Sequence, residues 1–397
     1  MIELYLENNL IATLKQDNKS YLIDYKNFEI QNSITLSLPN TKRFYTYKYR
    51  FPPYFETFLP EGYLYEIFKN LLTKEYGYID DYLILSKLAP NIRSRINFES
   101  NFSRLDFDFL EIENILENDS NDTFKKLLDI FLNKNAISGV QPKTVALLKE
   151  KETLHVNEYI IKTWGDEFPC LAENEHFCLK ACEYAGLKIA EIQLSHNKKF
   201  LVVKNFIFED DEILGFEEIL SLMDKNRTNK YDGSYEQVAK IIYQFSTHKK
   251  EALKEYYKMV VMNYLLKNGD AHLKNFGLLF KANFSEIFLS PVYDVVNTTA
   301  YIYKDRPALM LKGKKVWWNE DELVAFGVKN CLLSKKEAKS FYEKCIDAIK
   351  TIIKDIKIYI EENPEFQMIG TRMIDAFECS LENKTIKELP RELTRTW

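Results

Sequence analysis

Glycine and proline are scarce in this chain, which has 12 glycines and 11 prolines among 397 residues. This scarcity excludes collagen-like chains and disordered chains rich in both residues. No apolar run approaches the roughly 18 residues that a membrane-spanning helix needs. The segment Met1–Tyr5 lacks the basic flank and apolar stretch of a secretion signal. We therefore expect a cytoplasmic protein that does not enter a membrane.

Charge of one sign and paired cysteines are also lacking. Lysine and arginine number 54 and aspartate and glutamate 59, so the net charge of −5 gives no general attraction to nucleic acid or anionic lipid. None of the six cysteines forms a C-x-x-C pair. Cys178 and Cys182 would share one helix face, where packed thiols fit better than a metal site, because no His/Cys cluster completes one.

The chain has 27 phenylalanines and 25 tyrosines, which argue for packed cores. Its length suggests two or three domains. Alternating apolar residues predict short strands at 2–6, 10–14 and 21–25, and a helix then starts near Glu61. A short helix and loop are expected at 80–97. We treat 1–100 as the first region.

The second region, 101–210, mixes both kinds of element around a helix at 173–184, which Gly186 ends. We expect a further helix at 122–133 and strands at 144–148, 158–163, 189–194 and 200–206. The third region, 211–397, is mostly helical. It has a helix at 252–267, and the capping-box pattern Ser334-Lys335-Lys336-Glu337 starts another that runs to about 361. One apolar stripe of that helix predicts core packing. The stripe comprises Phe341, Cys345, Ile349, Ile352, Ile353, Ile356 and Ile360.

The stretch Asn268–Phe276 reads N-G-D-A-H-L-K-N-F. Asn268-Gly269 stops a helix, so we expect a loop in which Asp270 and Asn275 are five residues apart. Phosphotransfer sites need a carboxylate that accepts the proton of an attacking hydroxyl, and oxygen ligands for Mg²⁺. Protein kinases supply both at this D-x-x-x-x-N spacing. Alone, the spacing also fits a surface turn in which Asp270 caps a helix.

Further candidates stand in kinase order along the chain. Asp294, in the sequence P-V-Y-D, follows a predicted strand at 286–289 and would be a second metal ligand. Lys162 ends a strand, and Glu175 lies 13 residues later on a helix, where kinases place the pair that orients ATP phosphates. Each match alone has an ordinary structural explanation, but the common order argues against coincidence.

The turn S-G-V-Q-P-K, residues 138–143, is a fourth element. It holds one glycine, Gly139, and therefore no G-x-G-x-x-G motif. A turn of small residues can still present backbone amides and Lys143 to phosphate groups.

In these motifs the chain resembles the HipA toxin family, serine/threonine kinases with a fold related to phosphatidylinositol kinases. The similarity covers most of the chain. It is most specific at N-x-D-x-H-x-K-N-F (268–276) and P-x-Y-D (291–294). Other matching segments are L-S-L-P (36–39), F-x-x-x-L-P-E-G (55–62), S-G-x-Q-x-K (138–143), N-E-x-x-C (174–178), Lys230-Tyr231 and Ser234–Glu236. The resemblance implies an α+β, two-lobed kinase-like fold: a β-rich amino-terminal subdomain (1–100), a mixed lobe (101–210) and a mainly helical lobe (211–397).

The resemblance also implies a role for each candidate residue. Asp270 would be the catalytic base, and Asn275 and Asp294 would bind Mg²⁺. Lys162 would contact the ATP phosphates, with Glu175 as its ion-pair partner. His272 would either lie beside the nucleotide or merely shape the loop.

Family members can autophosphorylate a serine in the glycine-containing loop, which ejects the loop and switches the kinase off. In this chain an earlier serine position is occupied by Ala136, so Ser138 is the regulatory candidate. Gly139 and Lys143 would complete the phosphate-binding loop. A phosphate on Ser138 would add close to two negative charges and clash with ATP in the same pocket.

The family often acts on an aminoacyl-tRNA synthetase and is commonly held by a HipB-like antitoxin, a small helix-turn-helix protein that binds operator DNA. The net charge of −5 and the lack of a helix-turn-helix pattern suggest that this chain meets DNA through such a partner. The resulting prediction is an ATP- and Mg²⁺-dependent serine/threonine protein kinase that acts as a toxin on a cytoplasmic protein substrate.

Two departures from the family pattern keep alternatives open. The hinge strand, usually E-R-F-D-R, is Lys204–Phe208 with the sequence K-N-F-I-F, and Lys267 stands where glycine is common. The altered hinge favours a pseudokinase binding module, which Asp270, Asn275 and Asp294 oppose. A third hypothesis is a small-molecule kinase of the aminoglycoside or lipid type, which the L-P-E-G segment opposes.

Overall fold

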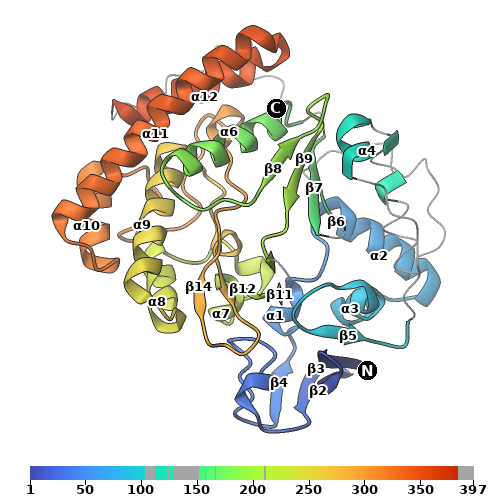
Figure 1. Ribbon diagram of the computed structural model, residues 1–397. Coiled ribbons are helices and arrows are strands. Elements are labelled where there is room, and N and C mark those ends of the chain that lie inside the picture. Colours follow the sequence, from blue (N-terminus) through green and yellow to red (C-terminus); the bar gives the residue numbers. More distant parts are fainter. Residues whose placement is uncertain are drawn as a thin grey trace. The chain divides into compact units, whose positions relative to one another are not determined.

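The computed structural model describes residues 1–102, 112–120, 122–123, 126–128, 152–156, 158–165, 167–209 and 212–382. The chain divides into two compact units, each discontinuous in sequence. The first unit takes 1–166, 195–229 and 279–287, and the second takes 167–194, 230–278 and 288–397. The predicted α+β class is confirmed, with a β-rich amino-terminal part and a mostly helical carboxyl-terminal part (Figure 1). The three-part division at 100 and 210 stays a prediction.

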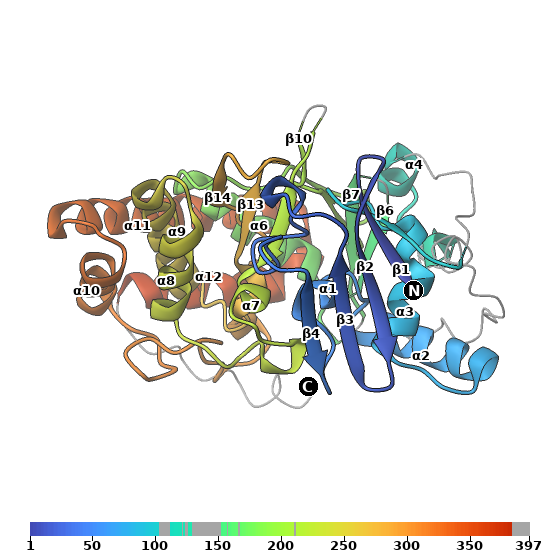
Figure 2. The ribbon, with the colours of Figure 1, turned by 90° about the horizontal axis from the view of Figure 1, so that it is seen from below.

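A five-stranded antiparallel sheet opens the first unit, in the order β4-β3-β2-β1-β5. Figure 2 shows β4, β3, β2 and β1 side by side. Its strands are β1 (Ile2–Leu6), β2 (Asn9–Asp17), β3 (Ser20–Tyr25), β4 (Phe44–Lys48) and β5 (Asn97–Glu99). Ile2 pairs with Leu14, and Leu4 with Ala12. All four are fully buried, because the period-two alternation turns the apolar side chains of both strands to one face. The strands predicted at 2–6, 10–14 and 21–25 are confirmed.

Helices complete the core of this unit. They are α1 (Pro53–Glu56), α2 (Gly62–Tyr76), α3 (Asp81–Leu88), α4 (Ile112–Glu117) and α7 (Ile219–Leu222), with 3-10 turns η1 (Ile30–Asn32), η2 (Ala89–Asn91) and η4 (Arg227–Asn229). Glu61 is the N-cap of α2, as the predicted helix start requires. The Asp80 carboxylate accepts from Leu83 N at 2.8 Å and caps α3. Phe68 of α2 shares the apolar core with Ile161 and Phe200 from the second sheet.

The second sheet has the order β6-β7-β9-β8. Its strands are β6 (Glu152–Val156), β7 (Tyr159–Thr163), β8 (Ile192–Leu194) and β9 (Phe200–Lys204). Two smaller sheets pair β10 (Phe208–Glu209) with β11 (Glu212–Ile213), and order β12 (Gly215–Glu218), β13 (Gly277–Phe280) and β14 (Ile287–Leu289) as β12-β13-β14. The strands predicted at 158–163, 200–206 and 286–289 are confirmed, and the one predicted at 189–194 is shortened to β8. The helix predicted at 122–133 and the strand at 144–148 lie mostly or wholly outside the described residues.

A buried carboxylate ties the L-S-L-P segment to β12. Glu217 is fully buried and accepts hydrogen bonds from the Thr35 hydroxyl at 2.6 Å and the Ser37 amide at 3.0 Å. The hydroxyls of Ser37 and Ser221 also donate to it. Burial raises the pKa of this carboxyl group, while the four hydrogen bonds oppose that effect. The L-S-L-P motif thus has a structural function in this unit.

The second unit is built mainly of helices. They are α6 (Leu171–Tyr184), α8 (Tyr235–Phe245), α9 (Lys249–Leu265), α10 (Glu320–Asn330), α11 (Lys335–Glu362) and α12 (Gln367–Leu381), with 3-10 turns η5 (Leu273–Asn275), η6 (Thr298–Ala300) and η7 (Pro364–Phe366). The long helix α11 packs against α6, α9, α10 and α12. Its predicted capping box is confirmed: the Ser334 hydroxyl accepts from Glu337 N at 3.2 Å, and Glu337 accepts from Ser334 N at 2.8 Å.

The predicted apolar stripe of α11 is buried at Cys345, Ile349, Ile352, Ile353 and Ile356. Phe341 and Ile360 are half-buried. Ile360 packs beside Gly370 of α12, so the prediction of core packing is wrong only for Phe341, which lines a cavity. No helix in the described part of the chain is both long and apolar enough to cross a bilayer.

Candidate active site

The end of α9 shapes the loop that carries Asp270. After Leu266, Lys267 takes a φ of +54°, a left-handed conformation that favours glycine. Asn268 then bonds back into the helix, from its amide to Asn263 O at 2.9 Å and from Nδ2 to Asn263 Oδ1 at 2.7 Å. The Asp270 amide donates to Asn268 Oδ1 at 3.1 Å. The left-handed turn explains why glycine suits position 267 in the resembled family.

Thr298 holds the same loop from the segment that follows the P-V-Y-D motif. Gly269 N donates to Thr298 Oγ1 at 2.9 Å, and Thr298 Oγ1 in turn bonds to Asp305. A Cβ atom on Gly269 would lie 1.8 Å from Asp305 Oδ2 and 2.7 Å from Thr298 Oγ1. Only glycine therefore fits here without displacing neighbours. Spacing alone gives no sign of this contact, because the partners are 29 and 36 residues away.

Asp270 presents its carboxylate to solvent, with 46% of the side chain exposed. The Tyr231 hydroxyl donates to Asp270 Oδ1 at 2.8 Å. The sequence placed Tyr231 in a family segment but assigned it no role. This bond fixes the position of one carboxylate oxygen, Oδ1.

His272 lies next to Asp270, with His272 Nε2 at 4.0 Å from Asp270 Oδ1. The imidazole ring of His272 makes an edge contact with the ring of Tyr231. Burial lowers the pKa of His272 from 6.5 to about 4, so the imidazole is neutral at pH 7. The His272 backbone amide donates to Asn275 Oδ1 at 2.9 Å. These contacts fit a residue that shapes the loop, which was one of its two predicted roles.

Asn275 and Asp294 are brought together as the motifs predicted. Asn275 Nδ2 donates to Asp294 Oδ2 at 2.7 Å, although the two residues are 19 apart in sequence. Mg²⁺ prefers carboxylate and carbonyl oxygens and is commonly held by one or two protein ligands together with substrate phosphates. The Asp294 carboxylate, and the Asn275 amide oxygen with its second lone pair, match that donor set. The side chains present therefore fit a Mg²⁺ site.

Backbone contacts position Asp294. The Val292 amide donates to Lys188 O at 2.8 Å, and the Tyr293 hydroxyl to Lys274 O at 2.6 Å. Asp294 then takes a φ of +60°, which aspartate tolerates better than most residues. Left-handed residues held by their surroundings are common at functional sites.

The roles of the other predicted site residues stay predictions. Lys162 lies in β7, which belongs to the first unit, and Glu175 lies in α6 of the second; both are buried. Their pairing stays a prediction. Ser138, Gly139 and Lys143 lie outside the described residues.

Asn174, beside Glu175 in the N-E-x-x-C stretch, has a positioning role. Its side chain exchanges two hydrogen bonds with the backbone of Asn297, at 3.0 Å and 2.8 Å. Asn297 Nδ2 donates to Leu266 O at 2.9 Å. These fully buried amides join α6, the end of α9 and the segment after Asp294. Both sides of the proposed site therefore rest on one buried network.

Comparisons with known proteins show which family this chain is similar to. Residues 135–353 match the model of a family described as HipA-like C-terminal domain. The chain is 31% identical over 184 residues to a Haemophilus influenzae protein named "Putative kinase". The matched segment covers 42% of this chain and 53% of that protein. It is 25% identical over 227 residues to "Putative kinase Y4dM" of Sinorhizobium fredii, covering 50% and 54% of the two chains. The chain thus spans about half the length of the curated relatives it matches.

Among solved structures, the Shewanella oneidensis complex of HipA, HipB and operator DNA contains a chain with a TM-score of 0.70 to this one. The two are 14% identical, and the match covers 98% of this chain and 100% of the other. This likeness shows the fold.

Proposed function

The chain belongs to the HipA-like C-terminal domain family, and from this premise we propose that it is an ATP- and Mg²⁺-dependent protein kinase that phosphorylates serine or threonine. The observation that carries the proposal is the cluster of Asp270, Asn275 and Asp294 on one loop and the motif bonded to it. A scaffold that only bound partners would have no physical need for all three side chains.

In the proposed reaction, Asp270 accepts the proton of the attacking hydroxyl. The Tyr231 hydroxyl holds Oδ1 at 2.8 Å and keeps the carboxylate in one orientation, so that Oδ2 is free to approach the substrate. The neutral His272 adds no positive charge beside the base at pH 7, because burial holds its pKa at about 4.

Asn275 and Asp294 would hold Mg²⁺, which neutralises charge on the transferring phosphate when it is bound. Their contact at 2.7 Å, the Tyr293–Lys274 bond and the network through Asn297 keep these oxygens in place beforehand. Such preorganisation is the main contribution a protein makes to phosphoryl transfer. We propose Lys162, paired with Glu175, as the contact to the ATP phosphates, and residues 138–143 as the phosphate-binding loop.

We also propose that the protein is the toxin of a toxin–antitoxin pair and acts in the cytoplasm. The solved neighbour is part of a toxin–antitoxin system with HipB and operator DNA. A HipB-like helix-turn-helix antitoxin would bind this chain, and DNA would be contacted through that antitoxin. The substrate would be a cytoplasmic protein, with an aminoacyl-tRNA synthetase as the first candidate, and Ser138 would be the site of autophosphorylation.

The test is peptide-resolved mass spectrometry after incubation with ATP and Mg²⁺, in the presence of a bacterial lysate cleared of nucleotide. The variants are Asp270→Asn and Asp294→Asn, and Asp375→Asn, an exposed residue on α12, is the matched control. We expect new phosphoserine or phosphothreonine in the wild type and the control. A lost general base costs about 10²- to 10⁴-fold in rate, so both site variants should show almost none.

Equal phosphorylation by wild type and Asp270→Asn would contradict the assignment of the base. A wild-type protein that transfers nothing to itself or to any lysate protein would favour a binding module without phosphotransfer. Transfer to a sugar or lipid but to no protein would favour a small-molecule kinase.

A further inference from the structure

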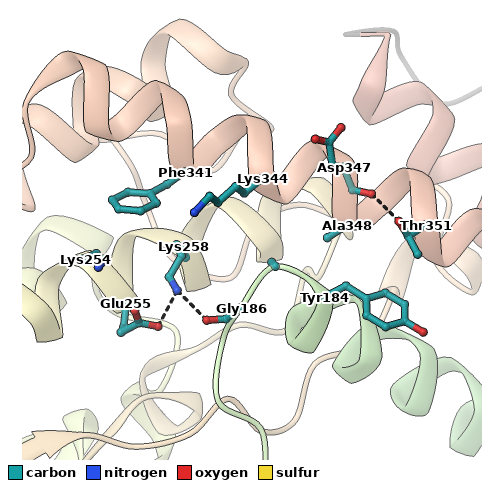
Figure 3. Close-up of a pocket in the computed structure, with 11 residues that line it drawn as sticks. Tyr184, Gly186, Lys254, Glu255, Lys258, Phe341, Lys344, Asp347, Ala348 and Thr351 are labelled. Atoms are coloured by element: carbon teal, nitrogen blue, oxygen red, sulfur yellow. Dashed lines mark hydrogen bonds and ion pairs between the residues drawn. The ribbon is translucent and has the colours of Figure 1, made fainter.

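A cavity of about 580 Å³ lies within the second unit (Figure 3). Its wall is formed by the end of α6 and one face each of α9 and α11. Sites for small molecules typically have volumes of about 300–1,000 Å³. The catalytic loop follows the end of α9 at Leu265. Of the α9 residues that line the cavity, Lys258 is nearest to that end, and the seven residues between them span about 10 Å along the helix axis. The cavity is therefore separate from the proposed active site.

Lys258 is a buried lysine in the cavity wall. It is only 5% exposed, and its ammonium group donates to Gly186 O at 2.8 Å and pairs with Glu255 at 2.8 Å. Gly186 has a φ of +74° and turns the chain after α6. Lys258 and Glu255 thus neutralise each other and fix the turn. Neither charge is available to a ligand.

The second carboxylate of the lining, Asp347, is also ion-paired. Asp347 pairs with Lys350, which does not line the cavity, at 3.1 Å. The Thr351 hydroxyl donates to the backbone oxygen of Asp347 at 2.9 Å. The acidic groups of the lining therefore do not neutralise its remaining lysines.

Two lysines are left without an opposite charge. Lys254 and Lys344 place their ammonium groups 5.3 Å and 5.9 Å from the centroid of the Phe341 ring. Within the described part of the chain, no carboxylate lies within 4.0 Å of either group. Contact with an aromatic ring orients an ammonium group but leaves its charge unbalanced. Phe341 is also the residue of the α11 stripe that does not enter the core.

From this arrangement we propose that the cavity binds a small organic phosphate monoester. A phosphate monoester carries close to two negative charges at pH 7, which matches the two unpaired ammonium groups, and lysine is a common point-charge ligand for phosphate. A bare phosphate ion is much smaller than the cavity. The organic part would lie against the lining residues Tyr184, Ala185 and Ala348.

The test uses isothermal titration calorimetry with glucose 6-phosphate, with glucose as the uncharged probe, on the full chain. A short phosphoserine peptide and its unphosphorylated form make a second arm, which distinguishes a metabolite from a modified protein as the source of the ester. The variant is Lys254→Gln combined with Lys344→Gln. Lys354→Gln is the matched control, because Lys354 is an exposed lysine of α11 that does not line the cavity.

We expect at least one phosphate ester to bind and its uncharged form not to bind. Each charge-assisted contact should contribute about tenfold in affinity, so the double variant should bind about 100-fold more weakly and the control within about twofold of the wild type. Binding of glucose 6-phosphate would identify a metabolite site, and binding of the peptide alone would place the ester on a protein. The proposal is overturned if no ester binds at millimolar concentration, or if the double variant binds as well as the wild type. Neither result depends on phosphotransfer, so this test and the kinase test can fail independently.

Discussion

Replacement of Lys267 by methionine should stabilise the protein at neutral pH. Lys267 is only 8% exposed, and its ammonium group lies 5.0 Å from the ring centroid of Trp317. Burial lowers its pKa from 10.5 to about 8. The unfolded chain therefore binds this proton more tightly than the folded chain, so the stability should rise as the pH increases from 8 to 10.5.

The size of the effect follows from that pKa difference. The pKa falls from 10.5 in the unfolded chain to about 8 in the folded chain. This difference lowers the unfolding free energy by about 3 kcal/mol at pH 7, where the lysine is protonated in both states. The contact with Trp317 offsets about 1 kcal/mol of this. We expect Lys267→Met, which keeps most of the side-chain volume, to raise the unfolding free energy by about 2–3 kcal/mol at pH 7. The gain should fall by about 1–2 kcal/mol at pH 9.5, where the folded-state lysine has mostly lost its proton.

The assay is urea unfolding of the wild type and Lys267→Met at pH 7 and pH 9.5. Lys240→Met serves as the control, because Lys240 is an exposed lysine of α8. Titration of other groups cancels when the two proteins are compared at each pH. A gain that is the same at both pH values, or a loss of stability at pH 7, would refute the argument that burial of the ammonium group is the cause.

Three other substitutions test contacts that the fold creates. Glu217→Ala should lower the unfolding free energy in urea by about 2–4 kcal/mol, because it leaves buried hydroxyl and amide donors unpaired; a loss below about 1 kcal/mol would contradict this. Gly269→Ala should lower both the melting temperature and the transfer rate, since its Cβ would lie 1.8 Å from Asp305 Oδ2; unchanged kinetics would show that the loop adapts. The unfolding free energy of the wild type should fall by up to about 3 kcal/mol as the pH falls from 6.5 to 4, because His272 stays neutral only in the folded state. The unfolding free energy of His272→Asn, measured in urea, should fall less over the same pH range. Equal losses in the two proteins would exclude His272 as the cause.

Much of the local structure was predictable from the sequence. Helix starts at Glu61 and Ser334, and the turn at Gly186, depend on contacts within a few residues, so their signals are contiguous in the chain. The β1–β3 strands follow a period of two that needs no tertiary context. Short strands such as β5, and the two-residue β10 and β11, carry too few residues to show any period. They form because a partner strand supplies the hydrogen bonds.

The motif residues Asp270, Asn275 and Asp294 were identifiable because each lies in a short contiguous pattern. Their proximity was expected only by analogy, and the contact of Asn275 with Asp294 confirms it for that pair. Tyr231 was in a recognised segment, but its bond to Asp270 spans 39 residues and has no spacing signal. A hydrogen bond of that reach depends on where two separate elements are held by the core.

The sequence by itself determined the family, the class of fold, the candidate chemistry and the residues to which it is assigned. Only the tertiary structure decided how those residues are supported and what surrounds them. It placed Phe341 at a cavity instead of in the core, lowered the pKa of Lys267 and His272, and made Gly269 necessary through Thr298 and Asp305. The physical reason is that burial and steric fit are properties of packed neighbours, whereas capping, turn and periodicity signals are properties of adjacent residues.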